Sequence, residues 1–170
     1  MQSGQTVFIA GCLGGLGRAA VQIARQRGAE IVGNYNASGR EEALALGVGE
    51  VADDRAFDPG PFRGRFNAVF DTAGALSLSQ CSGMLKRGGV AVHAVPKPGT
   101  LIAAMFSSRH KLASGAPLPQ RMAGITEAAE KGWLAPKISR TVSLAEAIPA
   151  ITELETTGLP KGKLVIVPMH

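Results

Sequence analysis

A glycine-rich segment near the N-terminus, Gly11-Cys12-Leu13-Gly14-Gly15-Leu16-Gly17, is of a type that binds phosphate through its backbone. It follows the apolar run 6–10 and precedes residues 18–27, where apolar residues recur at helical spacing. We therefore expect a buried parallel strand, a tight turn and a helix, in that order. Glycines leave room for a pyrophosphate to approach the main chain, and the helix N-terminus offers free N–H groups and a partial positive charge. This arrangement predicts dinucleotide binding.

The match to the Gly-x-Gly-x-x-Gly fingerprint is incomplete. Gly14 and Gly17 occupy its second and third glycine positions, whereas Cys12 stands at the first. A glycine motif alone is a weak signal, and the alternative is a structural turn that binds no ligand. The position between a strand and a helix favours the dinucleotide. For Cys12, packing beneath the pyrophosphate is favoured over a reactive thiol at a helix N-terminus.

The end of the second expected strand, residues 30–33, distinguishes between cofactors. A strand that binds NAD usually ends in an acidic residue that accepts a hydrogen bond from the ribose 2′-OH. Here the segment from Asn34 to Arg40 contains no carboxylate. The hydroxyl of Ser38 and the guanidinium of Arg40 can bind a 2′-phosphate instead, which predicts NADPH rather than NADH. The alternative is a solvated loop in which Arg40 binds nothing.

Other catalytic signatures do not occur in the sequence. The Tyr-x-x-x-Lys pair of short-chain dehydrogenases would need a lysine four residues after Tyr35, where Gly39 stands. The segment Gly17-Arg18-Ala19 lacks the lysine of a P-loop. Two cysteines and three histidines without metal-ligand spacing predict no metal site.

The histidines and the larger apolar side chains allow coarser expectations. His93 is expected to end a strand, either beside a nicotinamide ring or as a plain structural residue. We expect His110 and His170 on the surface, and Trp133 and Met122 in the core. No side chain stands out as a general acid.

Strand and helix patterns alternate along the N-terminal half. The expected strands are residues 6–10, 30–33, 50–52, 67–71 and 90–95, and the expected helices are 18–27, 41–46 and 79–85. This alternation predicts a Rossmann-type α/β fold, a doubly wound parallel sheet with helices on both faces in a three-layer sandwich. Residues 101–106 fit a strand or a helix. The remaining expectations are a helix at 120–131, a strand at 138–142, a capping box at 143–146 before a helix that Pro149 should kink or shorten, and a strand at 164–167.

Composition limits the class of protein. The 170 residues are 45% hydrophobic and 18% charged, with a formal net charge of +5, as in a soluble globular domain. There is no apolar stretch of about 18 residues, no secretory signal and no basic run. We therefore expect one domain over residues 1–170 in the cytoplasm, without nucleic acid or membrane as a partner.

Several motifs, taken in order, resemble one family. They are Gly4-Gln5-Thr6-Val7, the glycine turn, Ala20-Val21-Gln22-Ile23-Ala24, Leu46-Gly47-Val48, Asp71-Thr72-Ala73-Gly74, Leu85-Lys86-Arg87-Gly88-Gly89 and Gly162-Lys163-Leu164-Val165. Together they cover nearly the whole chain. The sequence resembles the nucleotide-binding half of the medium-chain dehydrogenase/reductase superfamily, in its zinc-independent quinone oxidoreductase and enoyl reductase branch.

The resemblance implies roles for particular residues. Backbone N–H groups at Gly14–Leu16 would bind the pyrophosphate, and Ser38 and Arg40 the 2′-phosphate. The loops after the fourth and fifth strands would line the adenosine and the nicotinamide ribose. Phe106 would lie near the nicotinamide, and Lys163 near the cofactor. The expected cofactor-binding residues are Gly11, Gly14, Gly15, Leu16, Gly17, Asn34, Ser38, Arg40, Thr72, Ala73, Gly74, Ala94, Val95, Phe106 and Lys163.

The resemblance also implies a reaction and a partner. NADPH would pass a hydride to a small electrophile, either a quinone or an α,β-unsaturated carbonyl. Family members carry an N-terminal domain that forms the other wall of the substrate cleft, and this sequence begins at the first Rossmann strand. A non-catalytic NADPH-binding module that senses redox state or docks a partner is therefore the alternative. Related proteins pair their sheets edge to edge, which implies a homodimer.

Overall fold

The computed structural model describes residues 2–113, 115, 119–157 and 162–168. The chain divides into two compact units, Met1–Leu134 and Ala135–His170. The expectation of one domain over residues 1–170 stays a prediction.

The first unit is built on a six-stranded parallel sheet. Its strands are β1 (Thr6–Ala10), β2 (Glu30–Tyr35), β3 (Glu50–Asp53), β4 (Phe66–Asp71), β5 (Leu85–His93) and β6 (His110–Leu112). Their order across the sheet is β3-β2-β1-β4-β5-β6. The chain therefore runs outward from β1 to β3 and returns to β4, which makes the boundary of β1 and β4 a topological switch point. The predicted Rossmann-type fold is confirmed.

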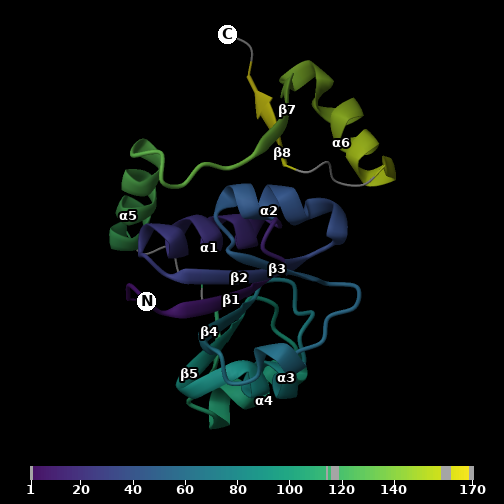
Figure 1. Ribbon diagram of the computed structural model, residues 1–170. Coiled ribbons are helices and arrows are strands. Elements are labelled where there is room, and N and C mark those ends of the chain that lie inside the picture. The colour runs from purple at the N-terminus through teal and green to yellow at the C-terminus, as the bar shows by residue number, and fades with distance from the viewer. Residues whose placement is uncertain (1, 114, 116–118, 158–161, 169–170) are drawn as a thin grey trace. The chain divides into compact units, whose positions relative to one another are not determined.

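Helices cover both faces of this sheet. They are α1 (Gly15–Gln26), α2 (Arg40–Leu46), α3 (Leu78–Met84) and α4 (Pro98–Phe106), with short 3-10 turns η1 (Ala37–Gly39) and η2 (Gly60–Phe62). The first unit also contains α5 (Pro119–Glu130). Figure 1 shows α1 and α2 on one side of the sheet and α3 and α4 on the other. The segment 101–106, for which the sequence left a strand or a helix open, is helical.

Alternation along β1 supplies both layers of the core. Val7 and Ile9 pack with the buried residues of α1 and α2, whereas Phe8 and Ala10 pack with those beneath α3. All four side chains are essentially inaccessible to solvent. This strand is apolar on both faces because it lies in the middle of a sheet that is covered on both sides.

Three expectations about burial are wrong. Trp133 and Met122 keep 41% and 49% of their surface exposed, and the Trp133 ring lies against the Lys131 ammonium instead of in the core. His110 was expected on the surface but is only 6% exposed, because it opens β6 and its ring points at His93. His170 lies outside the described residues.

The second unit is small and two-stranded. It contains β7 (Ile138–Ser143), a 3-10 turn η3 (Leu144–Glu146), α6 (Ala147–Thr157) and β8 (Lys163–Val167), and its two strands pair in parallel. The predicted capping box is confirmed, since the Ser143 N–H donates to Glu146 Oε2 at 3.0 Å. Pro149 does not interrupt α6, because it falls in the first turn, where no intrahelical N–H bond is needed.

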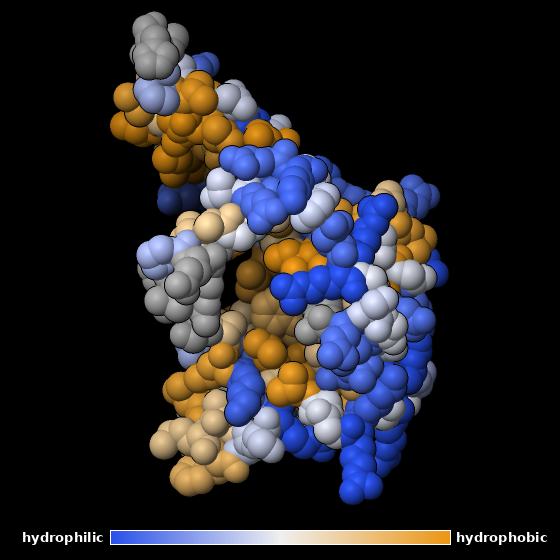
Figure 2. All heavy atoms as spheres, turned by 90° about the vertical axis from the view of Figure 1, so that its left-hand side faces the viewer, coloured by the Kyte–Doolittle hydropathy of each residue, from blue (hydrophilic) through white to orange (hydrophobic). Residues whose placement is uncertain are grey.

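Apolar side chains remain accessible on this second unit, and Figure 2 shows them as orange spheres at the top of the view. The most exposed among the described residues are Ile138, Leu144, Ile148, Ile151, Ile166 and Val167. A two-stranded sheet with one helix is too small to bury all of its apolar surface.

Candidate functional site

The glycine turn joins β1 to α1 at the switch point of the sheet. Gly11 has φ +69°, and a Cβ added there would lie 2.9 Å from Thr72 Oγ1. A Cβ added at Gly17 would lie 2.9 Å from Cys12 Cα and closer still to the Gly11 carbonyl oxygen. Both positions therefore require glycine, Gly11 for its dihedral angle and Gly17 for the close approach of α1 to the turn.

Gly14 and the first residues of α1 are not constrained in this way. Gly14 is the N-cap residue with φ −67° and ψ 166°, which any residue can adopt, and an added Cβ would meet only the Gly11 carbonyl oxygen, at 3.2 Å. No side chain caps α1, and its first turn contains no acidic residue. Gly15 and Leu16 are exposed. The uncapped N-terminus of α1 can therefore accept an anion.

Cys12 lies under the turn as a packing residue. It is fully buried, and a Cβ added at Gly33 of β2 would lie 2.9 Å from its Sγ. Burial raises the pKa of the Cys12 thiol to about 11, so the thiolate is not populated near neutral pH. This supports the packing interpretation over a reactive thiol.

Asn34 connects the turn to β2. Its side chain is buried, and its Oδ1 accepts a hydrogen bond from the Gly11 N–H at 2.9 Å. The Asn34 carbonyl oxygen accepts a second bond, from the Cys12 N–H at 3.2 Å. The amide therefore fixes the backbone on which a phosphate would be bound.

Arg18 has a structural role that the sequence did not suggest. Its Nε donates to the Leu13 carbonyl oxygen at 2.9 Å, and its Nη2 pairs with Glu42 Oε1 at 2.6 Å. The side chain is only 12% exposed. Arg18 thus ties the glycine turn to α2, and helical spacing in α1 gave no signal for this contact.

Ser38 and Arg40 stand after β2, as expected. Both residues are exposed. Ser38 Oγ donates to Asn36 Oδ1 at 2.7 Å, and Arg40 Nη1 donates to the Val51 carbonyl oxygen at 2.9 Å. One Arg40 nitrogen is therefore engaged by β3. A contact with a 2′-phosphate stays a prediction.

The loops after β4 and β5 meet beside the turn. Thr72 Oγ1 donates to the Ala10 carbonyl oxygen at 2.6 Å, and a Cβ added at Gly74 would lie 3.0 Å from Val95 Cβ. The Lys97 ammonium donates to the Gly74 carbonyl oxygen. The structure thus brings Gly11 together with two of the expected loop segments, 72–74 and 94–95.

Two further expected residues belong to other elements of the chain. Phe106 ends α4 and is 83% exposed. Lys163 begins β8 and belongs to the second unit. Their contacts with a cofactor stay predictions.

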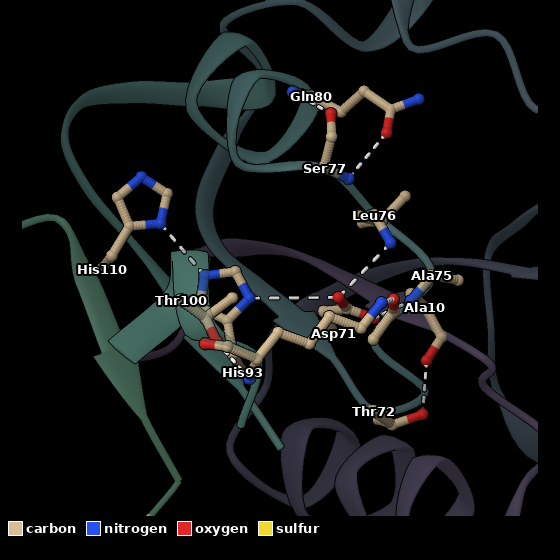
Figure 3. A network of polar contacts seen from close by, with 12 residues as sticks. Ala10, Asp71, Thr72, Ala75, Leu76, Ser77, Gln80, His93, Thr100 and His110 are labelled. Atoms are coloured by element: carbon tan, nitrogen blue, oxygen red, sulfur yellow. Dashed lines mark hydrogen bonds and ion pairs between the residues drawn. The ribbon is translucent and has the colours of Figure 1, made fainter. Parts of the chain in front are cut away.

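A chain of polar side chains from β4 to α3 was not predicted from the sequence, and Figure 3 shows its buried part, from Asp71 through His93 to His110. Asp71 and His93 end neighbouring strands in register, and His93 Nδ1 lies 3.9 Å from Asp71 Oδ2. His93 Nε2 contacts His110 Nδ1 at 3.0 Å, and His110 Nε2 contacts Ser82 Oγ at 2.9 Å. His93 therefore points into the layer of α3, and its ring is only 1% exposed.

Zinc does not fit the described residues. No three histidine, cysteine or acidic side chains among them are grouped as a metal site requires. His93 and His110 already bond to one another, and Cys12 and Cys81 are buried thiols.

Comparison with known proteins identifies the family of this chain. A sequence model described as zinc-binding dehydrogenase matches residues 46–166, more than half of the chain. No curated protein sequence matches.

Three solved structures show the same fold. The quinone oxidoreductase from Coxiella burnetii is 24% identical, with a TM-score of 0.77 over 97% of this chain and 53% of that one. The crotonyl-CoA carboxylase/reductase AntE V350A, in complex with NADP, is 21% identical, with a TM-score of 0.77 over 98% and 50%. A cobalt- and zinc-bound alcohol dehydrogenase from Pyrobaculum aerophilum is 22% identical, with a TM-score of 0.74 over 99% and 51%. The chain spans about half the length of each.

Proposed function

Because the chain belongs to the zinc-binding dehydrogenase family, we propose that its first unit binds NADPH and serves an enzyme that reduces a quinone or an α,β-unsaturated carbonyl. The observation that carries this proposal is the glycine turn at the switch point, followed by a helix whose N-terminus no side chain caps. In open α/β sheets, dinucleotides bind in this position.

Three backbone segments would hold the cofactor. The Gly14 N–H already donates to the Gly11 carbonyl oxygen at 2.9 Å, so the N–H groups of Gly15 and Leu16, at the start of α1, would bind the pyrophosphate. The loops 72–74 and 94–95 lie beside the glycine turn and would line the adenosine and the nicotinamide ribose. Asn34 and Arg18 keep the turn in shape from beneath.

The preference for NADPH rests on Ser38 and Arg40. Both are exposed, and no carboxylate precedes Glu41 after β2 to accept from a ribose 2′-OH. Arg40→Ala should remove a preference for NADPH over NADH of about tenfold, since a guanidinium–phosphate pair is a charge-assisted bond. Isothermal titration with both coenzymes measures this, and equal affinities in the unchanged chain would show that Arg40 serves only β3.

The chemistry would come from the cofactor, which supplies a hydride when it is bound. The residues of this chain contribute binding and orientation. His93 does not serve as a free general acid, because it is buried and bonded to His110.

Substitution of Gly14 tests the proposal most directly. Gly14→Val should weaken NADPH binding by at least about a hundredfold and leave the fold intact, because the backbone angles at Gly14 suit any residue. Gly83→Val is the matched control, since a Cβ at Gly83 meets nothing within 4 Å. Nicotinamide fluorescence during titration reports the affinity. Retained binding in Gly14→Val would place the pyrophosphate elsewhere.

Turnover separates the enzyme from a binding module. NADPH oxidation on addition of a quinone supports catalysis by this chain. Binding of NADPH without oxidation favours a module that senses redox state or docks a partner.

A homodimer through the sheet edge is also part of the proposal. β6 ends the sheet, and α4, beside it in the chain, exposes large apolar side chains. These are Leu101, Ile102, Met105 and Phe106. An unpaired edge flanked by apolar surface favours pairing with a second copy. Sedimentation at rising concentration tests this. No described helix is long and apolar enough to span a bilayer, and a cytoplasmic location stays a prediction.

A further inference from the structure

Four side chains from four elements form one polar series, which we call the histidine chain: the half-buried Ser82 of α3 and the buried His110 of β6, His93 of β5 and Asp71 of β4. Asp71, His93 and His110 are 1%, 1% and 6% exposed. The two imidazole rings lie nearly parallel, with an interplanar angle of 13° and centroids 5.3 Å apart. Buried polar groups in such number are costly unless their hydrogen bonds are made.

Valence fixes the direction of the protons in this chain. Between His93 Nε2 and His110 Nδ1, at 3.0 Å, one nitrogen must carry the proton and the other must accept it. His93 Nδ1 makes no hydrogen bond among the described residues, but the carboxylate of Asp71, 3.9 Å away, attracts a proton to that nitrogen through its charge. His93 Nε2 is then an acceptor, so His110 donates from Nδ1 and accepts at Nε2 from the Ser82 hydroxyl. All donors therefore point toward Asp71.

Asp71 also holds the loop that follows it. Its Oδ1 accepts from the Ala75 N–H at 3.0 Å, and its Oδ2 accepts from the Leu76 N–H at 3.3 Å. The loop enclosed by these two bonds contains Thr72, Ala73 and Gly74, three expected contacts of the cofactor. Any change in the position of the carboxylate would therefore change the conformation of this loop.

We propose that Ser82, His110 and His93 are positioning residues, which act through Asp71 to hold loop 72–76 in the conformation that binds the cofactor, and that proton uptake by the two histidines releases this loop. The inference rests on the proposed function for its effect on binding. Its effect on the loop can be measured without any cofactor.

The acid sensitivity follows from the groups that act on the rings. Burial lowers the pKa of His93, although the Asp71 carboxylate opposes this. Burial, the neighbouring His93 and the Arg109 guanidinium lower the pKa of His110. The thiol of Cys81, on α3, stays protonated because its pKa is about 12. Both rings are therefore neutral near pH 7, and when both are protonated their N–H groups face one another and the bond is lost.

Ring nitrogen shifts of the unchanged chain test the proton order. In long-range ¹H–¹⁵N spectra near neutral pH, Nδ1 of both histidines should be the protonated nitrogen and Nε2 the bare one. The opposite tautomer in either ring would overturn the proposal, because the donors would then point away from Asp71.

Exchange of the loop amides tests the coupling without cofactor. His110→Phe removes both ring contacts, and Ser82→Ala removes one hydroxyl while keeping α3. Hydrogen-exchange protection of the Ala75 and Leu76 amides should fall by about tenfold in His110→Phe and by a smaller factor in Ser82→Ala. Val21→Ala, on the opposite face of the sheet, is a control for general destabilisation and should leave the ratio of loop to core protection unchanged. If loop protection in both histidine-chain variants matches that control, the proposal is wrong.

The pH profile of NADP⁺ affinity tests the consequence for binding. The unchanged chain should bind about tenfold more tightly than His110→Phe near pH 8, and the two should converge near pH 5. Protonation of the 2′-phosphate affects both proteins equally and cancels in this ratio. A ratio that does not change with pH would overturn the proposal. If neither protein binds NADP⁺ near pH 8, the proposed function fails, and the exchange result still decides the inference.

Discussion

The glycine turn before α1 and the loop after β4 lie side by side, but they are held in shape by different means. The turn depends on missing side chains, since a Cβ at Gly11 would crowd the Thr72 hydroxyl and a Cβ at Gly17 would overlap the backbone of the turn. The loop depends on particular side chains, since the buried carboxylate of Asp71 binds two of its N–H groups. The turn is held by Asn34 and Arg18 and involves no histidine, whereas the loop, in our proposal, depends on two histidines. The loop should therefore be more sensitive to mild acid than the turn.

The largest expected effect comes from placing a side chain in the turn. Gly17→Ala should lower the free energy of unfolding by about 3 kcal/mol, because the new Cβ would overlap the Gly11 carbonyl oxygen and crowd Cys12. Urea unfolding followed by circular dichroism measures this. Gly83→Ala, a glycine-to-alanine change within α3, should not destabilise the protein. A Gly17→Ala protein as stable as the unchanged chain would mean that the turn is not rigid.

Removal of one charge from the loop should have a smaller effect. Asp71→Asn keeps the size of the side chain but leaves only one acceptor oxygen for two N–H groups, and should cost about 2 kcal/mol of unfolding free energy. Asp58→Asn is the matched control, since Asp58 is exposed and accepts one backbone bond, from the Gly60 N–H. Equal losses of unfolding free energy in the two variants would show that the burial of Asp71 does not strengthen its contribution to stability.

The smallest expected effect is the loss of unfolding free energy in mild acid, which should arise from the histidines behind the loop and not from the turn. The pKa values of His93 and His110 in the folded state lie below the ordinary 6.5, so unfolding takes up protons once the pH falls below about 6.5. Their stabilising contribution is complete above that pH and is lost as the pH falls through the folded values. The slope is about 1.4 kcal/mol per pH unit for each proton taken up.

Unfolding midpoints in urea between about pH 7 and 5.5 measure this slope. His110→Phe should flatten it, because one titrating ring is removed. An unchanged slope in that variant would assign the acid sensitivity to other groups.

The turn could be predicted from the sequence and the histidine chain could not, for a physical reason. The residues of the turn are consecutive, so their order alone implies strand, bend and helix. Asp71, Ser82, His93 and His110 become neighbours only through the parallel pairing of β4, β5 and β6. β6 has only three residues, too few for an alternating apolar pattern to predict a strand. Polar neighbours on both sides made His110 resemble a surface residue.

Other differences have the same origin. Helix α4 was ambiguous because its run of apolar residues suits either period, and the exposure of Trp133 depends on packing that no local pattern encodes. Asn34 was expected after a strand that ends at residue 33 but lies within β2, and its bond to the Gly11 N–H joins segments 23 residues apart. The direction of a side chain is decided by such distant contacts, whereas its strand or helix is decided locally.

The contacts of Arg18 connect the two regions proposed to bind the diphosphate and the adenosine ribose of the cofactor. One guanidinium connects the carbonyl of Leu13, in the pyrophosphate turn, with Glu42 in the helix that begins at Arg40. It acts as a spacer between the region meant for the diphosphate and the region meant for the adenosine ribose. A substitution at Glu42, which need not contact the ligand, would therefore weaken binding of the diphosphate and of the adenosine ribose together.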